Sequence, residues 1–181
     1  MKASIICRRW LAALLLGSIS AGSPGNEDTG GWPSGPFIPP EPWKETTVEL
    51  PAWPAGEKLL EVRVDKAMFP FDVYLDPDSL SVGSDHVVRY TLVVVSSSGA
   101  RNVSFEGIRC NTGEYRRYAY GSGGEWLQTN DTAWKRVLDA GMDGYRNILY
   151  RDHMCDPTGY DLQVSEILQR IRYSRGSYFE E

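Results

Sequence analysis

The side chains of this sequence best suited to covalent chemistry are two cysteines, Cys110 and Cys155. A catalytic thiol needs a neighbouring base, and the only two histidines of the chain are His86 and His153. Both cysteines fall on apolar faces of their segments, and the short Cys-x-x-Cys spacing that is usual for a redox pair is absent. We therefore expect a structural disulfide between Cys110 and Cys155, with a redox or nucleophilic role as the alternative.

Aromatic residues interleaved with arginine form a second candidate site. Arg116, Tyr118 and Tyr120 alternate along one segment, so a strand would place them on one face, and Trp126 and Trp134 follow nearby. Stacking and cation–π contacts from such a group could bind a sugar or a peptide. The structural alternative is that these side chains seal the outer edge of a small sheet.

Asp152 is the polar exception on an otherwise apolar helical stripe that ends at Cys155. A carboxylate at that position must reach solvent or a cation, which Arg109 or Arg89 could supply. Structural ion pairing is the default interpretation, and a catalytic carboxylate is the alternative.

The sequence predicts no metal site and no cofactor. A zinc site built from Cys110, His153 and Cys155 would lack a fourth ligand, and helical geometry points His153 away from the cysteine. An acidic turn around residues 76–85 resembles a calcium loop, but Leu80 stands where that loop needs an oxygen ligand.

The first 21 residues have the pattern of a secretory signal peptide: basic residues, a short apolar run and small residues ending at Ala21. The apolar run is shorter than the ~20 residues that span a bilayer, so we expect no transmembrane segment in the mature chain. The full chain has a net charge of −5, and removal of the signal takes away three basic residues and no acidic one, leaving −8. A nucleic-acid partner is therefore not expected, because phosphate binding needs a basic surface.

An arm rich in Pro, Gly and Trp follows the signal at residues 22–56. Its proline density excludes a helix or an inner strand. We expect the arm to be disordered before about Pro36 and, from Trp43 onward, to dock on the folded domain. The alternative is a proline-rich strip that binds a partner.

Residues 57–175 are predicted to form a single α+β domain, followed by a tail at 176–181. Alternation of apolar and polar residues predicts strands, and turn residues predict a connection at 76–85. The predicted strands lie at 59–64, 71–75, 86–95, 102–110 and 114–121. Strands followed by helices indicate a mostly antiparallel sheet with two C-terminal helices packed on it.

The strand at 102–110 changes parity, since Val103 and Phe105 share one face while Ile108 and Cys110 fall on the other. A β-bulge at Gly107 would return all four side chains to one face. We therefore predict a bulge that turns Cys110 toward Cys155.

Two helices are predicted at the end of the domain. The first covers 144–155 with Asp143 as its cap, and the second runs from about Asp161 to Tyr173.

Five sequence blocks occur in the order "SLSVG", "VVRYTLVV", "GARNVSFEGIRC", "EYRRYAYG" and "LYRDHMC", after an upstream "WKETTVELPAWP". Together they resemble the cryptic neisserial protein-like (CNP-like) family of bacterial exported proteins, over roughly residues 43–155. The resemblance implies an envelope protein of the bacterial periplasm, and it carries no catalytic residue over to this chain. Both cysteines fall within these blocks, which supports their pairing.

Three hypotheses of function follow. The first is a non-enzymatic binding or interaction module of the cell envelope, with an envelope protein or a glycan as partner. The second is a hydrolase of envelope polymers that uses a carboxylate such as Asp152. The third is a structural envelope component held by its N-terminal arm.

Overall fold

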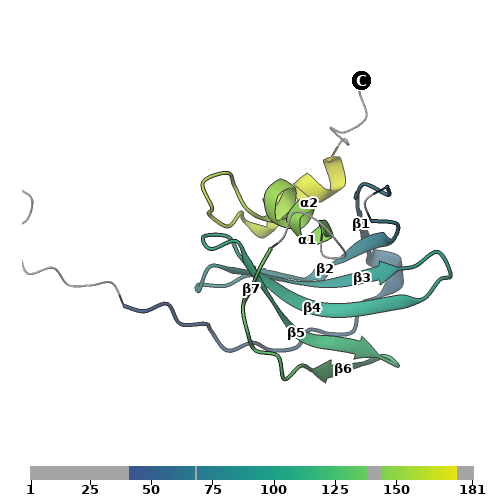
Figure 1. The fold of residues 1–181 in the computed structure, drawn as a ribbon, viewed down its shortest axis with the longest axis horizontal. Helices are drawn as coiled ribbons and strands as arrows, with labels where there is room; N and C mark the ends of the chain where they lie inside the picture. Colours follow the sequence, from purple (N-terminus) through teal and green to yellow (C-terminus); the bar gives the residue numbers. More distant parts are fainter. Residues whose placement is uncertain (1–40, 68, 138–143, 175–181) are drawn as a thin grey trace, which may run out of the picture. The chain divides into compact units, whose positions relative to one another are not determined.

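The computed structural model describes residues 41–67, 69–137 and 144–174 (Figure 1). The predicted signal peptide, the predicted disorder before Pro36, the cap at Asp143 and the tail at 176–181 lie outside these residues. The described residues from Pro42 onward belong to one compact unit.

The strands of the described residues form an antiparallel sheet in the order β1 to β6, with β7 paired to β5. Successive strands are neighbours because each is joined to the next by a local connection. At the β5–β6 hairpin, Ser122 pairs with Glu125 across Gly123 and Gly124, whose φ angles are 61° and 89°. A two-residue turn with both φ angles positive suits glycine, which carries no Cβ. The strands are β1 (Leu60–Val62), β2 (Asp72–Val82), β3 (Val87–Val95), β4 (Arg101–Arg109), β5 (Glu114–Ser122), β6 (Glu125–Gln128) and β7 (Lys135–Arg136).

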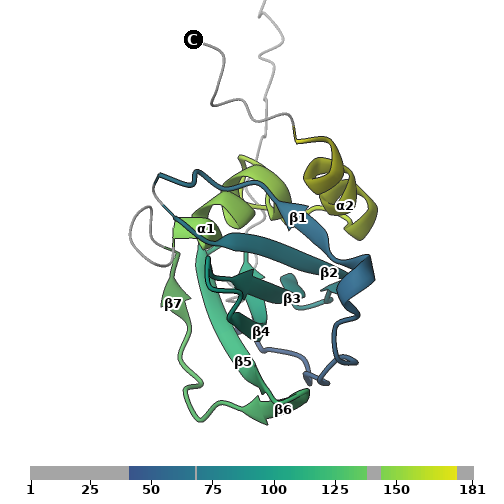
Figure 2. The same cartoon turned by 90° about the vertical axis from the view of Figure 1, so that its right-hand side faces the viewer.

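Helices cover one face of this sheet (Figures 1 and 2). A 3₁₀ turn, η1 (Gly56–Lys58), precedes β1, and α1 (Gly144–Ile148) continues into a π-helical turn, η2 (Leu149–Met154). The last helix, α2 (Val164–Tyr173), buries Ile167 and Ile171. This architecture confirms the predicted α+β class.

An N-terminal strap, residues 42–54, runs along the opposite face of the sheet without helix or strand of its own (Figure 1). Its Val48 and Leu50 pack against a small core made by Phe105, Tyr118 and Ala119. Because both faces are covered, every residue of β3 from Val87 to Val93 is buried.

The predicted bulge at Gly107 is wrong. The β3–β4 pairing is continuous from Val87 opposite Arg109 to Val95 opposite Arg101, so β4 alternates without interruption. Ile108 and Cys110 therefore face the helices, whereas Phe105 faces the strap side, and apolar residues on both faces are buried. The parity change in the sequence reflects a sheet covered on two sides.

Two boundaries also differ from the sequence prediction. The segment expected to be a turn at 76–85 largely belongs to β2, which bulges between Asp76 and Ser81 and so accommodates Pro77. Helix α2 begins at Val164, after Asp161, because Gln163 and Glu166 form the capping box there.

Candidate ligand site beneath the strap

The strap is anchored at its start by Trp43. The indole Nε1 of Trp43 donates a hydrogen bond to the carbonyl of Asp85 at 2.8 Å, and the Arg109 guanidinium lies 3.7 Å from the Trp43 ring centroid. Trp134 meets Trp43 edge to face, with ring centroids 5.9 Å apart. These contacts are the docking that the sequence predicts from Trp43 onward.

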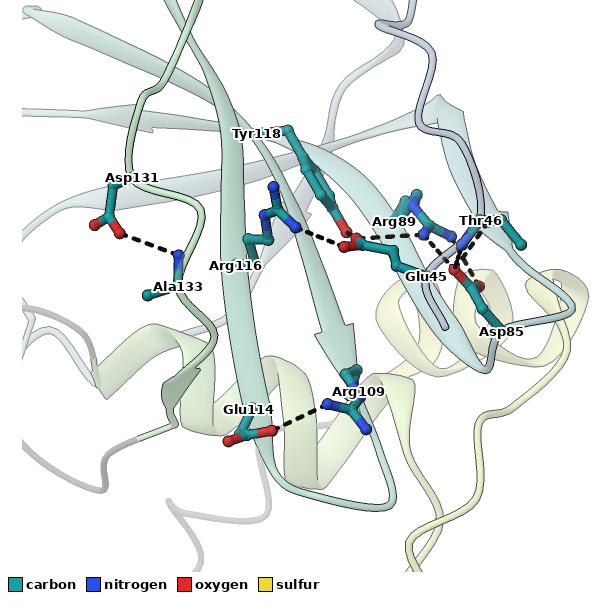
Figure 3. A network of polar contacts seen from close by, with 10 residues as sticks. All are labelled: Glu45, Thr46, Asp85, Arg89, Arg109, Glu114, Arg116, Tyr118, Asp131 and Ala133. Atoms are coloured by element: carbon teal, nitrogen blue, oxygen red, sulfur yellow. Dashed lines mark hydrogen bonds and ion pairs between the residues drawn. The ribbon is translucent and has the colours of Figure 1, made fainter. Parts of the chain in front are cut away.

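Glu45 lies at the centre of a polar cluster on the strap face (Figure 3). Its carboxylate pairs with Nη1 of Arg116 at 2.5 Å and with Nη2 of Arg89 at 3.6 Å. The hydroxyl of Tyr118 donates to the same carboxylate at 2.6 Å. Two arginines and one phenol from the sheet therefore converge on a single strap carboxylate.

Asp85 ties the next strap residue to the sheet (Figure 3). Both the backbone N–H and the hydroxyl of Thr46 donate to the Asp85 carboxylate at 2.8 Å, and Arg89 donates to it twice, at 3.1 and 2.6 Å. Burial alone would raise the pKa of Asp85, but the hydrogen bonds from Arg89 and Thr46 outweigh it and hold the pKa well below its ordinary value. Asp85 is therefore a carboxylate across the physiological range.

A bulge in β5 decides which side chains reach this cluster. The pairing of β4 with β5 slips between Phe105 and Glu106, so that Tyr118 is the extra residue of β5. Arg116 and Tyr118 face the strap, whereas Tyr120 lies on the helix side, where its hydroxyl accepts a hydrogen bond from Arg117 at 2.9 Å. The structure thus joins two of the three predicted residues and separates Tyr120 from them.

A pocket of about 390 Å³ opens between the strap and the β5–β6 edge. Its walls carry two charged side chains, one phenol, one amide, three hydroxyls and two aliphatic groups. They are Glu45, Thr46, Thr47, Val48, Leu50, Arg116, Tyr118, Gln128 and Thr129. Such a volume suits a small ligand, and these walls offer it mostly hydrogen-bonding groups.

Burial raises the pKa of Tyr118, and its hydrogen bond to Glu45 raises it further. The phenol is therefore protonated at neutral pH and acts as a donor toward Glu45. Within the pocket, the acidic and basic groups are bound to each other.

The two predicted tryptophans hold the strap and do not line the pocket. Trp126 donates from Nε1 to the carbonyl of Pro51 at 2.9 Å and packs against Trp53, with ring centroids 5.3 Å apart. Trp134 lies at the other end, beside Trp43 and Arg109. Their role in this structure is to bind the chain's own strap.

Asp152 does not reach Arg89 or Arg109, because those two arginines lie on the strap face while Asp152 lies on the helix side. Its carboxylate pairs instead with the neighbouring Arg151 at 3.0 Å, at the surface. The predicted ion pairing of Asp152 is therefore confirmed, but its partner is Arg151 and not Arg109 or Arg89.

His153 is 3% exposed, contrary to the prediction that it points away from the apolar face. The wider π-helical turn places His153 beside Met154 on the buried side of η2. Burial lowers the pKa of His153, so the imidazole is neutral at physiological pH. The described residues contain no group of three His, Cys, Asp or Glu side chains that could hold a metal ion.

A buried charge cluster on the helix side was missed by the sequence analysis. Glu106 and Arg146 are both fully buried, and Arg146 donates to the two oxygens of Glu106 from Nε and Nη2 at 2.7 Å each. Burial alone would raise the pKa of Glu106, but hydrogen bonds and charge from Arg146, and the charge of Arg117, hold it below its ordinary value. Because Arg146 belongs to α1 and Glu106 to β4, their ion pair holds the helix against the sheet.

The structure brings Cys110 and Cys155 to disulfide distance. Their sulfur atoms lie 1.98 Å apart, and both residues are buried. The bond joins the residue after β4 to the end of η2, as the sequence predicts, although no bulge is needed to direct it.

Fold and site together define a class: an α+β protein whose meandering antiparallel sheet carries helices on one face and, on the other, a polar pocket under an N-terminal strap. Within that class, the model of the CNP1-like family matches residues 39–172, and the chain belongs to this family. The matched range includes the whole strap and nearly all of α2. Comparisons with curated proteins and with solved structures found no match. In the part of the chain that the structure describes, no helix has the length and apolar character to cross a membrane.

Proposed function

We propose that this chain is an exported protein of the bacterial periplasm that binds an envelope glycan in the pocket beneath the strap, without catalysing a reaction. Export is supported by the signal-peptide pattern of the first 21 residues. The observation that carries the binding function is the pocket of about 390 Å³ with hydrogen-bonding walls.

Binding is favoured over catalysis by the pairing of the charged groups in the pocket. Glu45 is held by Arg116, Arg89 and the Tyr118 hydroxyl, so its carboxylate oxygens are already occupied by donors of the chain itself. The other polar walls, among them Gln128 and the threonines, are uncharged. Amide, hydroxyl and guanidinium groups are suited to hold sugar hydroxyls by hydrogen bonds.

A compact glycan is favoured over an extended peptide by the geometry of the sheet edge. Strand β7 pairs with Glu114 and Tyr115, and β6 pairs from Ala119 onward. The edge of β5 between them is only three residues long, and Thr129 already donates to the carbonyl of Tyr118 at 3.0 Å. A peptide that adds to a sheet needs a longer free edge, since strands usually have about five residues.

The binding function is tested by calorimetric titration of the mature protein with the soluble N-acetylglucosamine–N-acetylmuramic acid disaccharide. We expect saturable binding, weakened about 2- to 10-fold by Gln128→Ala, which removes one neutral hydrogen-bonding group from the pocket wall. Gln169→Ala, an exposed amide on α2, is the matched control and should leave the affinity unchanged. Absence of saturable binding up to millimolar concentration, or equal weakening by both variants, contradicts the proposed function.

Export is tested separately by fractionation of a bacterial host that expresses the full chain. We expect the periplasmic fraction to contain a chain that begins after Ala21 by mass spectrometry. An intact N-terminus in the cytoplasmic fraction contradicts this part of the proposal.

A further inference from the structure

Glu45 occupies its site as a bound ligand would. It belongs to the strap, which has no regular secondary structure, while every group that holds it belongs to the sheet. Arg116 contributes an ion pair at 2.5 Å, and Tyr118 contributes a hydrogen bond at 2.6 Å. A guanidinium beside a phenol is a binding site for a carboxylate group.

Arg116 links this carboxylate site to the pocket. Of the described residues that line the pocket, it alone has a cationic side chain, and that side chain is 22% exposed. Glu45 also lines the pocket, with 16% of its side chain exposed. A ligand in the pocket therefore reaches the same guanidinium that holds the strap.

The arginines also have donors that Glu45 does not use. The Nε atoms of Arg89 and Arg116 are buried and have no hydrogen-bond partner among the described residues. Each guanidinium has five N–H groups, and Arg116, which lines the pocket with 22% of its side chain exposed, can bind a second acceptor beside Glu45 or in its place.

Release of Glu45 leaves the rest of the strap attached. Trp43 keeps its hydrogen bond to Asp85, Thr46 keeps two bonds to the Asp85 carboxylate, and Trp53 keeps its packing on Trp126. The strap has no ladder of strand pairing to break. An exchange at Glu45 is therefore a local event.

We propose that Arg116 binds the carboxylate of an acidic sugar in the pocket, and that this carboxylate competes with Glu45 for the guanidinium. The inference rests on the proposed function, since it names the ligand class of the same pocket. It assigns Glu45 as an internal competitor that makes the affinity for acidic ligands lower than the site itself allows.

The test compares two sugars that differ by one carboxylate-bearing group, N-acetylmuramic acid and N-acetylglucosamine, on the full mature protein by calorimetry. Glu45→Gln should raise the affinity for N-acetylmuramic acid about tenfold, because the freed charge on Arg116 then pairs with the ligand, and should leave N-acetylglucosamine unchanged. Glu49→Gln makes the same charge change at an exposed position of the strap and should alter neither affinity. In the Glu45→Gln background, Arg116→Gln should remove the preference for the acidic sugar.

The outcomes separate the two proposals. If both sugars bind wild type and Glu45→Gln with equal affinity, the carboxylate inference is overturned while the glycan function stands. If neither sugar, and not the disaccharide either, binds wild type or the variant, the proposed function fails. If Glu45→Gln does not fold, the NMR chemical shift of the Arg116 Nε–Hε group in the wild-type protein provides the test. This chemical shift should change on addition of N-acetylmuramic acid and should not change on addition of N-acetylglucosamine. The same response to both sugars also overturns the inference.

Discussion

Replacement of Glu106 by glutamine tests the energetic role of the buried cluster. The carboxylate accepts from Arg146 at 2.7 Å through both oxygens, from Arg117 at 3.0 Å and from Ser104 at 2.9 Å. Glutamine keeps the shape of the side chain but removes the charge and offers an N–H₂ group to the guanidinium. Arg146, which is fully buried, then has no carboxylate from β4 to compensate its charge.

The expected loss is about 3–5 kcal/mol in the free energy of unfolding, the range for removing one partner of a buried ion pair. The Tyr115 and Tyr145 rings remain in the variant, with centroids 4.3 and 4.6 Å from the Arg146 guanidinium. Because their cation–π contacts still stabilise the Arg146 charge, we expect a loss near the lower end of this range. A domain of ordinary stability has about 5–15 kcal/mol in total, so the effect is large.

The effect also has a defined pH dependence. The pKa of Glu106 is lowered in the folded state, so its contribution is complete above the ordinary glutamate pKa and is lost as the pH falls below it. The stability difference between wild type and Glu106→Gln should be constant between about pH 6 and 8 and should narrow below about pH 4.5.

Urea unfolding of the oxidised protein measures the change as a shift of the midpoint at constant slope. Glu114→Gln removes a carboxylate from the more exposed pair with Arg109 at 3.3 Å and should cost less than about 1 kcal/mol. The double variant Glu106→Leu/Arg146→Met should recover at least half of the loss, because the fully buried charge of Arg146 is removed together with its partner, while Arg117, 29% exposed, can reach solvent. A loss below about 1 kcal/mol for Glu106→Gln, or no recovery in the double variant, would refute the reasoning.

Three further predictions concern other parts of the chain. Thiol titration of the denatured, unreduced protein should find no free thiol at Cys110 or Cys155, and two titratable thiols would contradict the pairing. Reduction of the disulfide should lower the free energy of unfolding by about 4 kcal/mol, because the bond closes a loop of 45 residues. Gly121→Ala places a Cβ 2.6 Å from the Trp53 ring and should destabilise the protein by about 1–3 kcal/mol in thermal or urea unfolding. Gly56→Ala is the control and should change the stability little, because its Cβ would meet only the Arg101 side chain, at an ordinary contact distance of 3.9 Å. Asp152→Asn should change the free energy of unfolding by less than about 0.5 kcal/mol and should leave glycan binding unchanged. A loss of binding in this variant would indicate a functional role for the Asp152 carboxylate.

The fold class and the cysteine contact could be read from the sequence because they depend on short-range patterns. Alternation located β3 and β4 well, and the helical stripe placed Cys155 on an inward face. For the part of β2 that follows Asp76, by contrast, the sequence predicts a turn, since Pro77 and the acidic residues are typical of turns. Tertiary pairing overrides such local signals where a bulge accommodates the proline.

The buried charges escaped the sequence analysis for a different reason. Glutamate and arginine are almost never fully buried unless paired, and the partners Glu106 and Arg146 are 40 residues apart in the chain. One signal was present: Glu106 has the same parity as Ile108 and Cys110, so a sheet covered on both faces had to bury it. The bulge postulated at Gly107 placed those residues on the other face and concealed that consequence.

The irregularity that shapes the candidate site lies in β5. An unbulged β5 would put Arg116 and Tyr118, as well as Tyr120, on one face, as alternation predicts. The extra residue at Tyr118 keeps Arg116 and Tyr118 on the strap side, turns Tyr120 to the helix side and interrupts the outer edge of the strand where β7 and β6 part. That gap in the edge adjoins the pocket, and the two side chains retained on the strap side are two of the three that hold Glu45. One inserted residue thus accounts for the position of the pocket, for its cation and for the attachment of the strap above it. Deletion of a residue at this bulge should therefore abolish glycan binding even if the sheet still folds, with circular dichroism to report the sheet and calorimetry to report the ligand.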